Sequence, residues 1–255
     1  MNRIAKLFST KKSNILSIYF TAGHPRLNDT AIIIKAIEKS GADMVEIGIP
    51  FSDPIADGPV IQNSNQVSLK NGMSLKLLFE QLKDIRKEVS IPLLFMGSLN
   101  PVFKFGVENF CDKCMEVGID GTIIPDLPAY EYEDKYIKTF EKNELYNIFL
   151  VTPQTDNDRI YHLDNLSKGF IYMVSSYATT GSGKGFEQSQ TYFERMQKMN
   201  LKNPRLIGFG IKDKSTFQNA CKYAQGAIIG TAFIKALEKQ GKIEEKVRNF
   251  IKEIL

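Results

Sequence analysis

The sequence has few of the residues from which metal centres and disulfide frameworks are built. It contains three cysteines and two histidines in 255 residues. An odd number of cysteines without disulfide-like spacing indicates a reducing compartment. His24 and His162 are far apart, so the pattern predicts neither a metal site nor a Ser-His catalytic triad. Cys111 and Cys114 form a C-x-x-C spacing within a predicted helix, without a second cysteine pair, and we interpret them as structural.

Long apolar runs and dense charge are missing too. No stretch approaches the roughly 20 apolar residues that cross a bilayer as a helix. Residues 1–12 are polar and amphipathic, with no apolar segment long enough for a signal peptide. The net charge is only +4, and Lys and Arg are spread along the chain, which suits an anionic small molecule at least as well as nucleic acid. We therefore expect a soluble, cytoplasmic protein that binds neither membranes nor nucleic acid.

What the chain does contain is a regular alternation of β-rich runs and helical patterns. After a short N-terminal helix at residues 2–9, strands are predicted at 15–20, 44–47, 91–96, 121–124, 146–151, 170–175, 205–209 and 227–229. Helices are predicted at 28–40, 74–89, 106–117, 130–143, 158–167, 189–199 and 213–223, and from 231 into the C-terminus. Such alternation predicts parallel strands with right-handed crossovers. About eight units in this length favour an α/β fold of the (β/α)8 TIM-barrel type, as a single domain over residues 1–255.

Two carboxylates lie at the end of the second predicted strand and in the loop after it. Glu46 is near the end of that strand, and Asp57 lies on the proline-rich loop that continues to Pro59. The barrel places every strand-to-helix loop on one face, where burial raises a carboxyl pKa and suits it to proton transfer. Two carboxyls in different environments can divide acid and base work. Spacing alone leaves an alternative equally open, in which Glu46 is salt-bridged and Asp57 caps the turn at Gly58-Pro59.

Glycines follow the last three predicted strands, as Thr180-Gly181, Gly208-Phe-Gly210 and Gly230-Thr231. Glycine lets backbone N–H groups approach an anion closely, and a helix starting near Thr231 adds the positive end of its dipole. Because barrels of this kind often bind a phosphate between their last loops, the pattern favours phosphate binding over simple tight turns. The Ser/Thr/Gly-rich stretch 176–187 is typical of an active-site lid, with an ordinary surface loop as the alternative.

A longer motif connects these features to a known family. The run Phe51-Ser-Asp-Pro-Ile-Ala-Asp-Gly-Pro59 after Glu46 resembles the signature of the tryptophan synthase alpha chain family. Further matches fall in order along essentially the whole chain: Thr21-Ala-Gly-His-Pro25, Met96-Gly97, Leu99-Asn-Pro-Val-Phe103, Pro125-Asp-Leu-Pro128, Thr180-Gly181, Gly208-Phe-Gly210 and Gly230-Thr231-Ala232. The resemblance implies a (β/α)8 barrel that cleaves indole-3-glycerol phosphate to indole and glyceraldehyde 3-phosphate. This is a retro-aldol reaction for which the chain itself would need no cofactor.

The resemblance also implies roles for single residues. Glu46 would be the acid/base that drives tautomerisation at indole C3 and handles the glycerol hydroxyl proton. Asp57 would hold the indole N–H and stabilise the positive charge that develops on the ring. Thr180, on the lid, would bond to Asp57 on closure. The remaining implied positions are the pocket lining and the phosphate contacts: Tyr19, Tyr172, Ile228, Gly181, Gly210, Gly230 and Thr231.

The family further implies a partner. A tryptophan synthase beta chain, carrying pyridoxal phosphate, would form an αββα heterotetramer with this chain and receive indole through a tunnel. Pro50, Asp53, Asp126 and Pro128 would face that partner, although a turn role for Asp126 is as open as a functional one. Other interpretations are a stand-alone lyase that releases free indole, a barrel that mainly activates the beta chain, and a different phosphate-binding barrel such as a sugar-phosphate isomerase.

The chain departs from the family's pattern at three places. Ser176 to Thr179 stand where many members have an arginine-containing lid. Ser98 stands where tyrosine is common, which would make the indole pocket roomier, and Thr231 replaces a frequent serine. None of these departures removes an expected catalytic residue.

Overall fold

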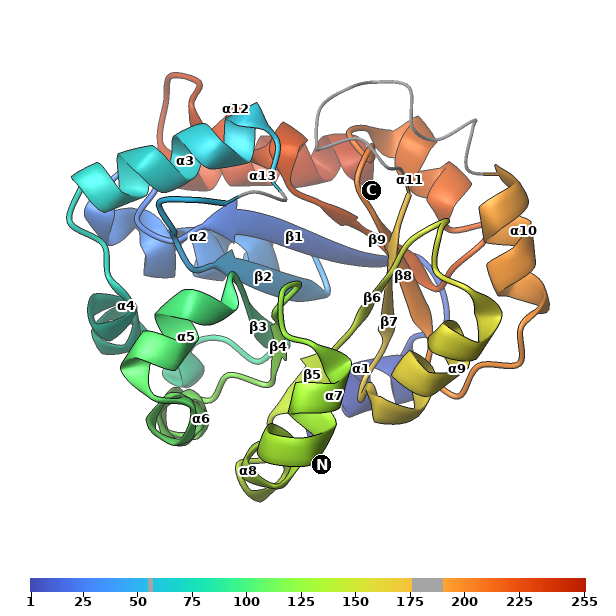
Figure 1. The fold of residues 1–255 in the computed structure, drawn as a ribbon. Helices are drawn as coiled ribbons and strands as arrows, with labels where there is room; N and C mark the ends of the chain where they lie inside the picture. The colour runs from blue at the N-terminus through green and yellow to red at the C-terminus, as the bar shows by residue number, and fades with distance from the viewer. Residues whose placement is uncertain (55–56, 176–189) are drawn as a thin grey trace.

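A computed structural model describes residues 1–54, 57–175 and 190–255, and its centre is a parallel sheet curled into a nearly closed barrel (Figure 1). The sheet order is β5-β4-β3-β2-β1-β9-β8-β7-β6. The strands are β1 (Ile15–Thr21), β2 (Met44–Gly48), β3 (Leu93–Met96), β4 (Gly121–Ile123), β5 (Tyr146–Ile148), β6 (Leu150–Val151), β7 (Ile171–Val174), β8 (Arg205–Gly208) and β9 (Gly226–Ile229). The predicted (β/α)8 barrel is confirmed.

One chain segment closes the ring. The two ends of the sheet order, β5 and β6, are consecutive in sequence and are separated only by Phe149. The Phe149 carbonyl accepts a hydrogen bond from the backbone N–H of Tyr172 in β7 at 3.0 Å. β5 pairs with β4 and β6 pairs with β7. The segment predicted as one strand at residues 146–151 therefore joins the two edges of the sheet.

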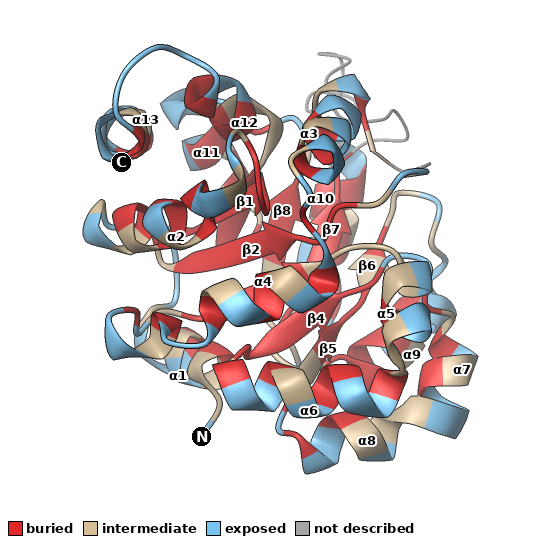
Figure 2. Cartoon of the chain, turned by 90° about the vertical axis from the view of Figure 1, so that its left-hand side faces the viewer, coloured by how far each residue is buried: buried red, intermediate tan, exposed pale blue. Residues whose placement is uncertain are grey.

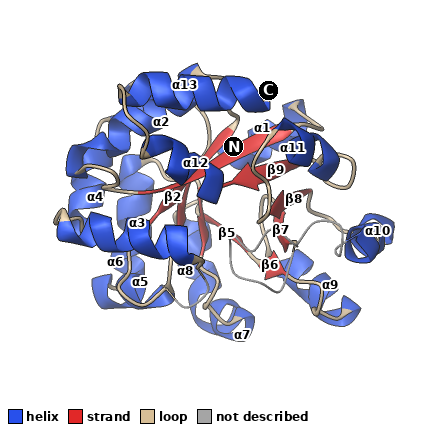
Figure 3. Ribbon diagram, turned by 90° about the horizontal axis from the view of Figure 1, so that it is seen from above, coloured by secondary structure: helices blue, strands red, loops and turns tan. Residues whose placement is uncertain are grey.

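Helices surround the barrel (Figure 3). They are α1 (Arg3–Thr10), α2 (Thr30–Lys39), α3 (Pro59–Lys70), α4 (Leu75–Leu82), α5 (Leu99–Phe105), α6 (Val107–Val117), α7 (Ala129–Glu131), α8 (Ile137–Lys142), α9 (Asn157–Leu166), α10 (Gln190–Lys198), α11 (Lys214–Ala220), α12 (Thr231–Leu237) and α13 (Ile243–Ile254). Two 3-10 helices are η1 (Leu27–Asp29) and η2 (Ile85–Lys87), and η3 (Tyr132–Tyr136) is a short π-helix. Among the described residues, no helix has the length and apolar character needed to span a membrane.

Two helices lie where only loops were expected, and the expected C-terminal helix is divided. α3 follows Gly58 with proline at its first position, which suits a helix start. α5 starts in the Leu99-Asn-Pro101 segment, and proline in a first turn costs no helical hydrogen bond. The helix expected from residue 231 to the C-terminus is split into α12 and α13, because Gly241 has a left-handed φ of +115°.

The apolar core has two layers, separated by the strands. In β1, Ile15 and Tyr19 belong to the cluster inside the barrel, whereas Leu16, Ile18 and Phe20 pack in the cluster beneath the helices. This alternation follows from the two-residue period of a strand. Figure 2 shows the strands as an almost continuous buried centre between partly exposed helices.

The N-terminal helix covers the barrel end at which the strands begin. Asn2 donates from its side chain to the carbonyls of Asp120 and Glu144, at 2.8 and 2.9 Å. Ile4 is fully buried, and a Cβ on Gly121 would lie 2.9 Å from its Cδ1 atom. Gly121 is the first residue of β4. α1 therefore closes this end, and the opposite end, where the strands finish, is the barrel mouth.

Candidate active site

Glu46 is a fully buried carboxyl inside the barrel. Its Oε1 atom accepts a hydrogen bond from the Ser17 hydroxyl at 2.8 Å, and its Oε2 atom has no hydrogen-bond partner among the described residues. Burial raises the pKa of Glu46 to about 8, and the Ser17 hydrogen bond opposes that rise. No ion pair of Glu46 occurs in the described part of the chain, so the salt-bridged alternative is wrong there. A carboxyl with this pKa is protonated at neutral pH and can act as an acid.

Asp57 lies half-buried on the loop between β2 and α3. Asn65 donates to its Oδ2 atom over a long 3.5 Å, and the backbone N–H of Asp57 donates to the carbonyl of Pro54 at 3.2 Å. Burial raises the pKa of Asp57 to about 6, with the Asn65 hydrogen bond opposing the rise. The N-cap position of α3 is occupied by Gly58, so Asp57 is not the N-cap residue of that helix.

Two tyrosines share the mouth with these carboxyls. Tyr19 of β1 stands in register with Glu46 of β2. Burial raises the pKa of Tyr19, and the charges of Asp57 and Glu46 contribute further. Burial likewise raises the pKa of Tyr172, and the charges of Glu46, Tyr19 and Asp57 raise it further. Because the effect of a charge on a pKa weakens with distance, Glu46, Asp57, Tyr19 and Tyr172 lie near enough to influence one another's ionisation.

The tyrosine rings lie across neighbouring strands that carry glycine. A Cβ on Gly48 would overlap the Tyr19 hydroxyl, and a Cβ on Gly208 would overlap that of Tyr172. Ile228 of β9 also faces the interior and is buried. The predicted lining residues Tyr19, Tyr172 and Ile228 are therefore together in one cluster at the barrel centre.

The glycine loops at the ends of β8 and β9 are neighbours. Ile207 of β8 and Ala227 of β9 are partners in the sheet. Gly210 lies three residues after Ile207, and Gly230 lies three residues after Ala227. Gly210 has a left-handed φ of +75°. Gly230 directly precedes α12, whose first residue is Thr231, and a Cβ on Gly230 would lie 3.1 Å from Tyr19 Cδ1. These loops therefore reach the Tyr19 side of the mouth.

Two of the predicted site residues cannot be placed. Thr180 and Gly181 lie outside the described residues, as does the rest of the predicted lid at 176–187. The beginning of that connection is described: the Ser175 hydroxyl donates to the carbonyl of Phe209 at 2.7 Å. The segment after β7 thus starts beside the loop that follows β8.

The residues predicted to face a partner occupy different environments. Pro50 is buried within the chain, Pro128 is half-buried, and Asp53 and Asp126 are exposed. The Oδ1 atom of Asp126 accepts a hydrogen bond from the backbone N–H of Leu99 at 2.8 Å. Asp126 therefore joins the loop after β4 to the start of α5, in addition to any role toward a partner.

Two exposed aromatic side chains were missed at the sequence level. Phe103 of α5 is 65% exposed and Tyr130 of α7 is 67% exposed. Both follow the two loops that Asp126 joins. Exposed apolar patches are typical of interaction surfaces, and these two side chains add apolar area to this part of the surface. Phe103 was present in the matched motif, but without a predicted helix its exposure could not be inferred.

Cysteine chemistry does not contribute to the site. Cys111 and Cys114 are fully buried, unbonded members of the core beneath the helices. Burial raises the pKa of the Cys111 thiol to about 12, which makes it inert as a nucleophile. Across the described residues, no group of three or more His, Cys, Asp and Glu side chains is arranged to hold a metal ion.

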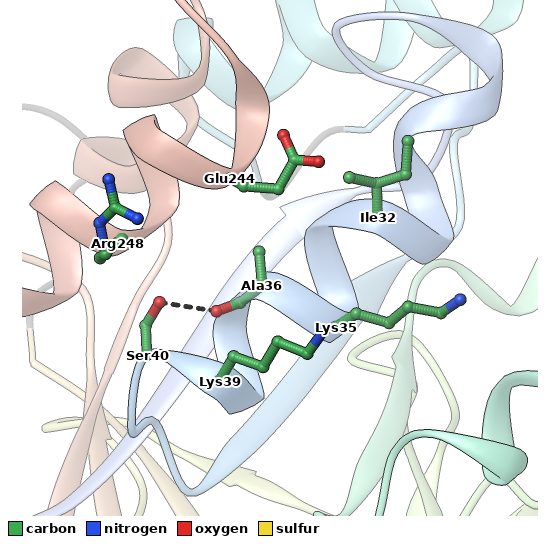
Figure 4. Close-up of a pocket in the computed structure, with 7 residues that line it drawn as sticks. All are labelled: Ile32, Lys35, Ala36, Lys39, Ser40, Glu244 and Arg248. Atoms are coloured by element: carbon green, nitrogen blue, oxygen red, sulfur yellow. Dashed lines mark hydrogen bonds between the residues drawn. The ribbon is translucent and has the colours of Figure 1, made fainter.

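A separate hollow of about 410 Å³ lies in the helix layer between α2 and α13 (Figure 4). Its lining is formed by Ile32, Lys35, Ala36, Lys39, Ser40, Glu244 and Arg248. Lys35 is paired with Glu88 at 2.6 Å and points away from Arg248 in Figure 4. The cations do not converge, and none of the mouth residues takes part, so this hollow is not the candidate active site.

Comparison with known proteins relates the whole chain to one family. Residues 5–254 match the family model for the tryptophan synthase alpha chain. The alpha chain of Flavobacterium psychrophilum is 59% identical over 256 residues, covering 100% of both chains. That of Bacteroides thetaiotaomicron is 55% identical over 248 residues, covering 97% of both. A solved tryptophan synthase alpha chain from Legionella pneumophila superposes with a TM-score of 0.87 at 32% identity, covering 100% of this chain and 96% of that one.

Proposed function

The chain belongs to the tryptophan synthase alpha chain family, a family of lyases that cleave indole-3-glycerol phosphate, and from this premise we propose that Glu46 and Asp57 carry out that cleavage at the barrel mouth. The observation that carries the proposal is the state of Glu46. It is a fully buried carboxyl with a pKa of about 8, one oxygen held by Ser17 and the other without a partner among the described residues.

Glu46 supplies the proton that makes the carbon–carbon bond breakable. The bond from indole C3 to the glycerol chain breaks readily only after C3 is protonated, which requires a positioned acid. Glu46 is protonated at neutral pH because its pKa is about 8. After giving its proton to C3, the carboxylate accepts the proton of the hydroxyl next to the breaking bond. Indole and an aldehyde result, and Glu46 returns to its protonated form.

Asp57 stabilises the intermediate that this protonation creates. Protonation at C3 places positive charge on the ring nitrogen. With a pKa of about 6, Asp57 is ionised at neutral pH, so it accepts the indole N–H hydrogen bond and opposes the developing charge. Tyr19, Tyr172 and Ile228 form the walls around the ring, and their common cluster inside the barrel supports this arrangement.

The substrate phosphate binds at the loops that follow β8 and β9. Backbone groups near Gly210, Gly230 and Thr231 hold it, together with Gly181 from the lid. Support comes from the adjacent loops after β8 and β9 and from the position of Gly230 against Tyr19. The contact of Thr180 with Asp57 stays a prediction from the sequence, because Thr180 lies outside the described residues.

The family implies a beta-chain partner, and we propose an αββα heterotetramer in which the pyridoxal phosphate belongs to the beta chain. The loops that carry Pro50, Asp53 and Asp126 to Pro128 face that partner. The exposure of Asp53 and Asp126, and of Phe103 on the helix whose start Asp126 contacts, supports this surface. The protein is expected in the cytoplasm, which stays a prediction from the sequence.

Indole release from indole-3-glycerol phosphate, measured with and without the cognate beta chain, tests this function. The purified chain should form indole without an added cofactor, and the beta chain should raise the rate. Equal, high rates in both conditions would instead establish a stand-alone lyase. Absence of indole in both conditions would contradict the proposed reaction.

A further inference from the structure

Ser17 places a hydroxyl in an apolar layer of the barrel interior. It is fully buried, and its in-register neighbours are Met44 of β2 and Ile228 of β9. Ile15, two residues earlier on the same face, is also apolar. Burying a hydroxyl costs free energy unless it is hydrogen-bonded, and an apolar side chain would fill this space without that cost. The hydroxyl at this position therefore calls for a reason other than packing.

The hydroxyl donates to Glu46 Oε1 at 2.8 Å. Ser17 is level with Met44, two residues before Glu46, so the Glu46 side chain bends back toward the closed end of the barrel to reach it. The other carboxyl oxygen has no partner in the described ranges. A flexible side chain with one oxygen anchored has few remaining orientations, so this contact sets where Oε2 points.

We propose that Ser17 is a positioning residue for the cleavage reaction, holding Oε1 of Glu46 so that Oε2 faces the substrate. The inference rests on the role of Glu46 proposed above. The same contact also opposes the effect of burial on the pKa of Glu46. Without the Ser17 hydroxyl the carboxyl would hold its proton to higher pH, and its carboxylate would be harder to form during the reaction.

A pair of nearly isosteric variants separates the hydroxyl from its packing. Ser17→Thr keeps a hydroxyl on a β-branched side chain, and Ser17→Val has the same shape without it. We expect Ser17→Thr to keep kcat within about threefold of wild type. We expect Ser17→Val to lose at least about tenfold in kcat, part of the 10²–10⁴-fold that a positioned acid/base supplies, with KM nearly unchanged. The descending limb of its kcat/KM profile should also move to higher pH.

Further variants keep this result interpretable. Ser17→Ala, which adds no bulk, should behave like Ser17→Val and replaces it if the valine chain does not fold. Equal kcat and equal pH profiles for the threonine and valine variants would overturn the positioning role. Glu46→Gln in the same assay separates the two proposals. If it is active, the proposed function fails, whereas if it is inactive and the Ser17 variants are indistinguishable, only the present inference fails.

Discussion

At neutral pH the two carboxyls of the barrel mouth carry different charges. Burial raises the pKa of Glu46 to about 8 and that of Asp57 to about 6. The difference follows from position, because Glu46 is on a strand inside the barrel and Asp57 is on a half-exposed loop. One carboxyl is therefore an acid and the other an anion, which is the division that protonation of an indole ring requires.

The pKa of Glu46 also predicts how stability depends on pH. Because the folded-state pKa of Glu46 lies above its ordinary value of 4.5, the native state binds the proton more tightly than the unfolded chain. The protonated Glu46 carboxyl contributes its full stabilisation below pH 4.5, and this stabilisation is lost as pH rises through about 8. At about 1.4 kcal/mol per pH unit, the loss amounts to at most about 5 kcal/mol.

Urea unfolding of wild type and Glu46→Gln between pH 5 and 8 measures this effect. The free energy of unfolding of the wild type, relative to the variant, should fall steadily over that range. The exposed residue Glu253 provides a matched control, because Glu253→Gln should run parallel to wild type. A Glu46→Gln curve that is also parallel to wild type would show that the carboxyl is not buried in its neutral form.

At the scale of secondary structure, α1 is the element that closes one end of the barrel. Ile4→Ala should lower the free energy of unfolding by about 2–5 kcal/mol, because it removes buried methyl groups and leaves a cavity against β4. The rate of indole formation by the folded variant should stay close to wild type, because the helix covers the end opposite the mouth. Thermal or urea unfolding and a rate assay on the same samples check both parts.

Met115→Ala serves as the surface control for this experiment. Met115 is 56% exposed on α6, and its replacement should change stability by less than about 0.5 kcal/mol. A large loss of rate in Ile4→Ala at unchanged stability would contradict the division of the barrel into a structural end and a catalytic end.

Most elements could be predicted from the sequence, and the exceptions have physical causes. The strands and outer helices show apolar periodicity because they bury one face against the core. α3 does not, since its buried positions include Ser64, Asn65 and Ser68. Ser64 and Ser68 hydrogen-bond to Thr21 and to the carbonyl of Ala22 in the segment after β1. A helix that buries polar side chains lacks apolar periodicity, so the sequence pattern does not distinguish it from a loop.

In the whole molecule, the mouth combines segments that are distant in sequence. Tyr19, Glu46, Tyr172 and Ile228 come from four strands and meet in the barrel interior. The place of Glu46 near a strand end could be predicted, because parallel strands present their carboxyl ends together. Tyr19, Tyr172 and Ile228 were expected only from the family resemblance. The contact between Ser17 and Glu46 could not be predicted, because it depends on the register of β1 against β2 and on a side chain that bends back along its strand.

The central claim is that Glu46 moves the protons of the cleavage reaction, and the rate of indole formation by Glu46→Gln in the presence of the beta chain tests it most directly. Asp57→Asn, measured alongside, should also lose rate because the amide cannot oppose the ring charge. Glu46→Gln should fold, still bind the beta chain, and form indole at least about 10²–10⁴-fold more slowly than wild type, since it retains the shape but not the proton of the acid. Indole formation within tenfold of wild type would contradict the assignment of Glu46.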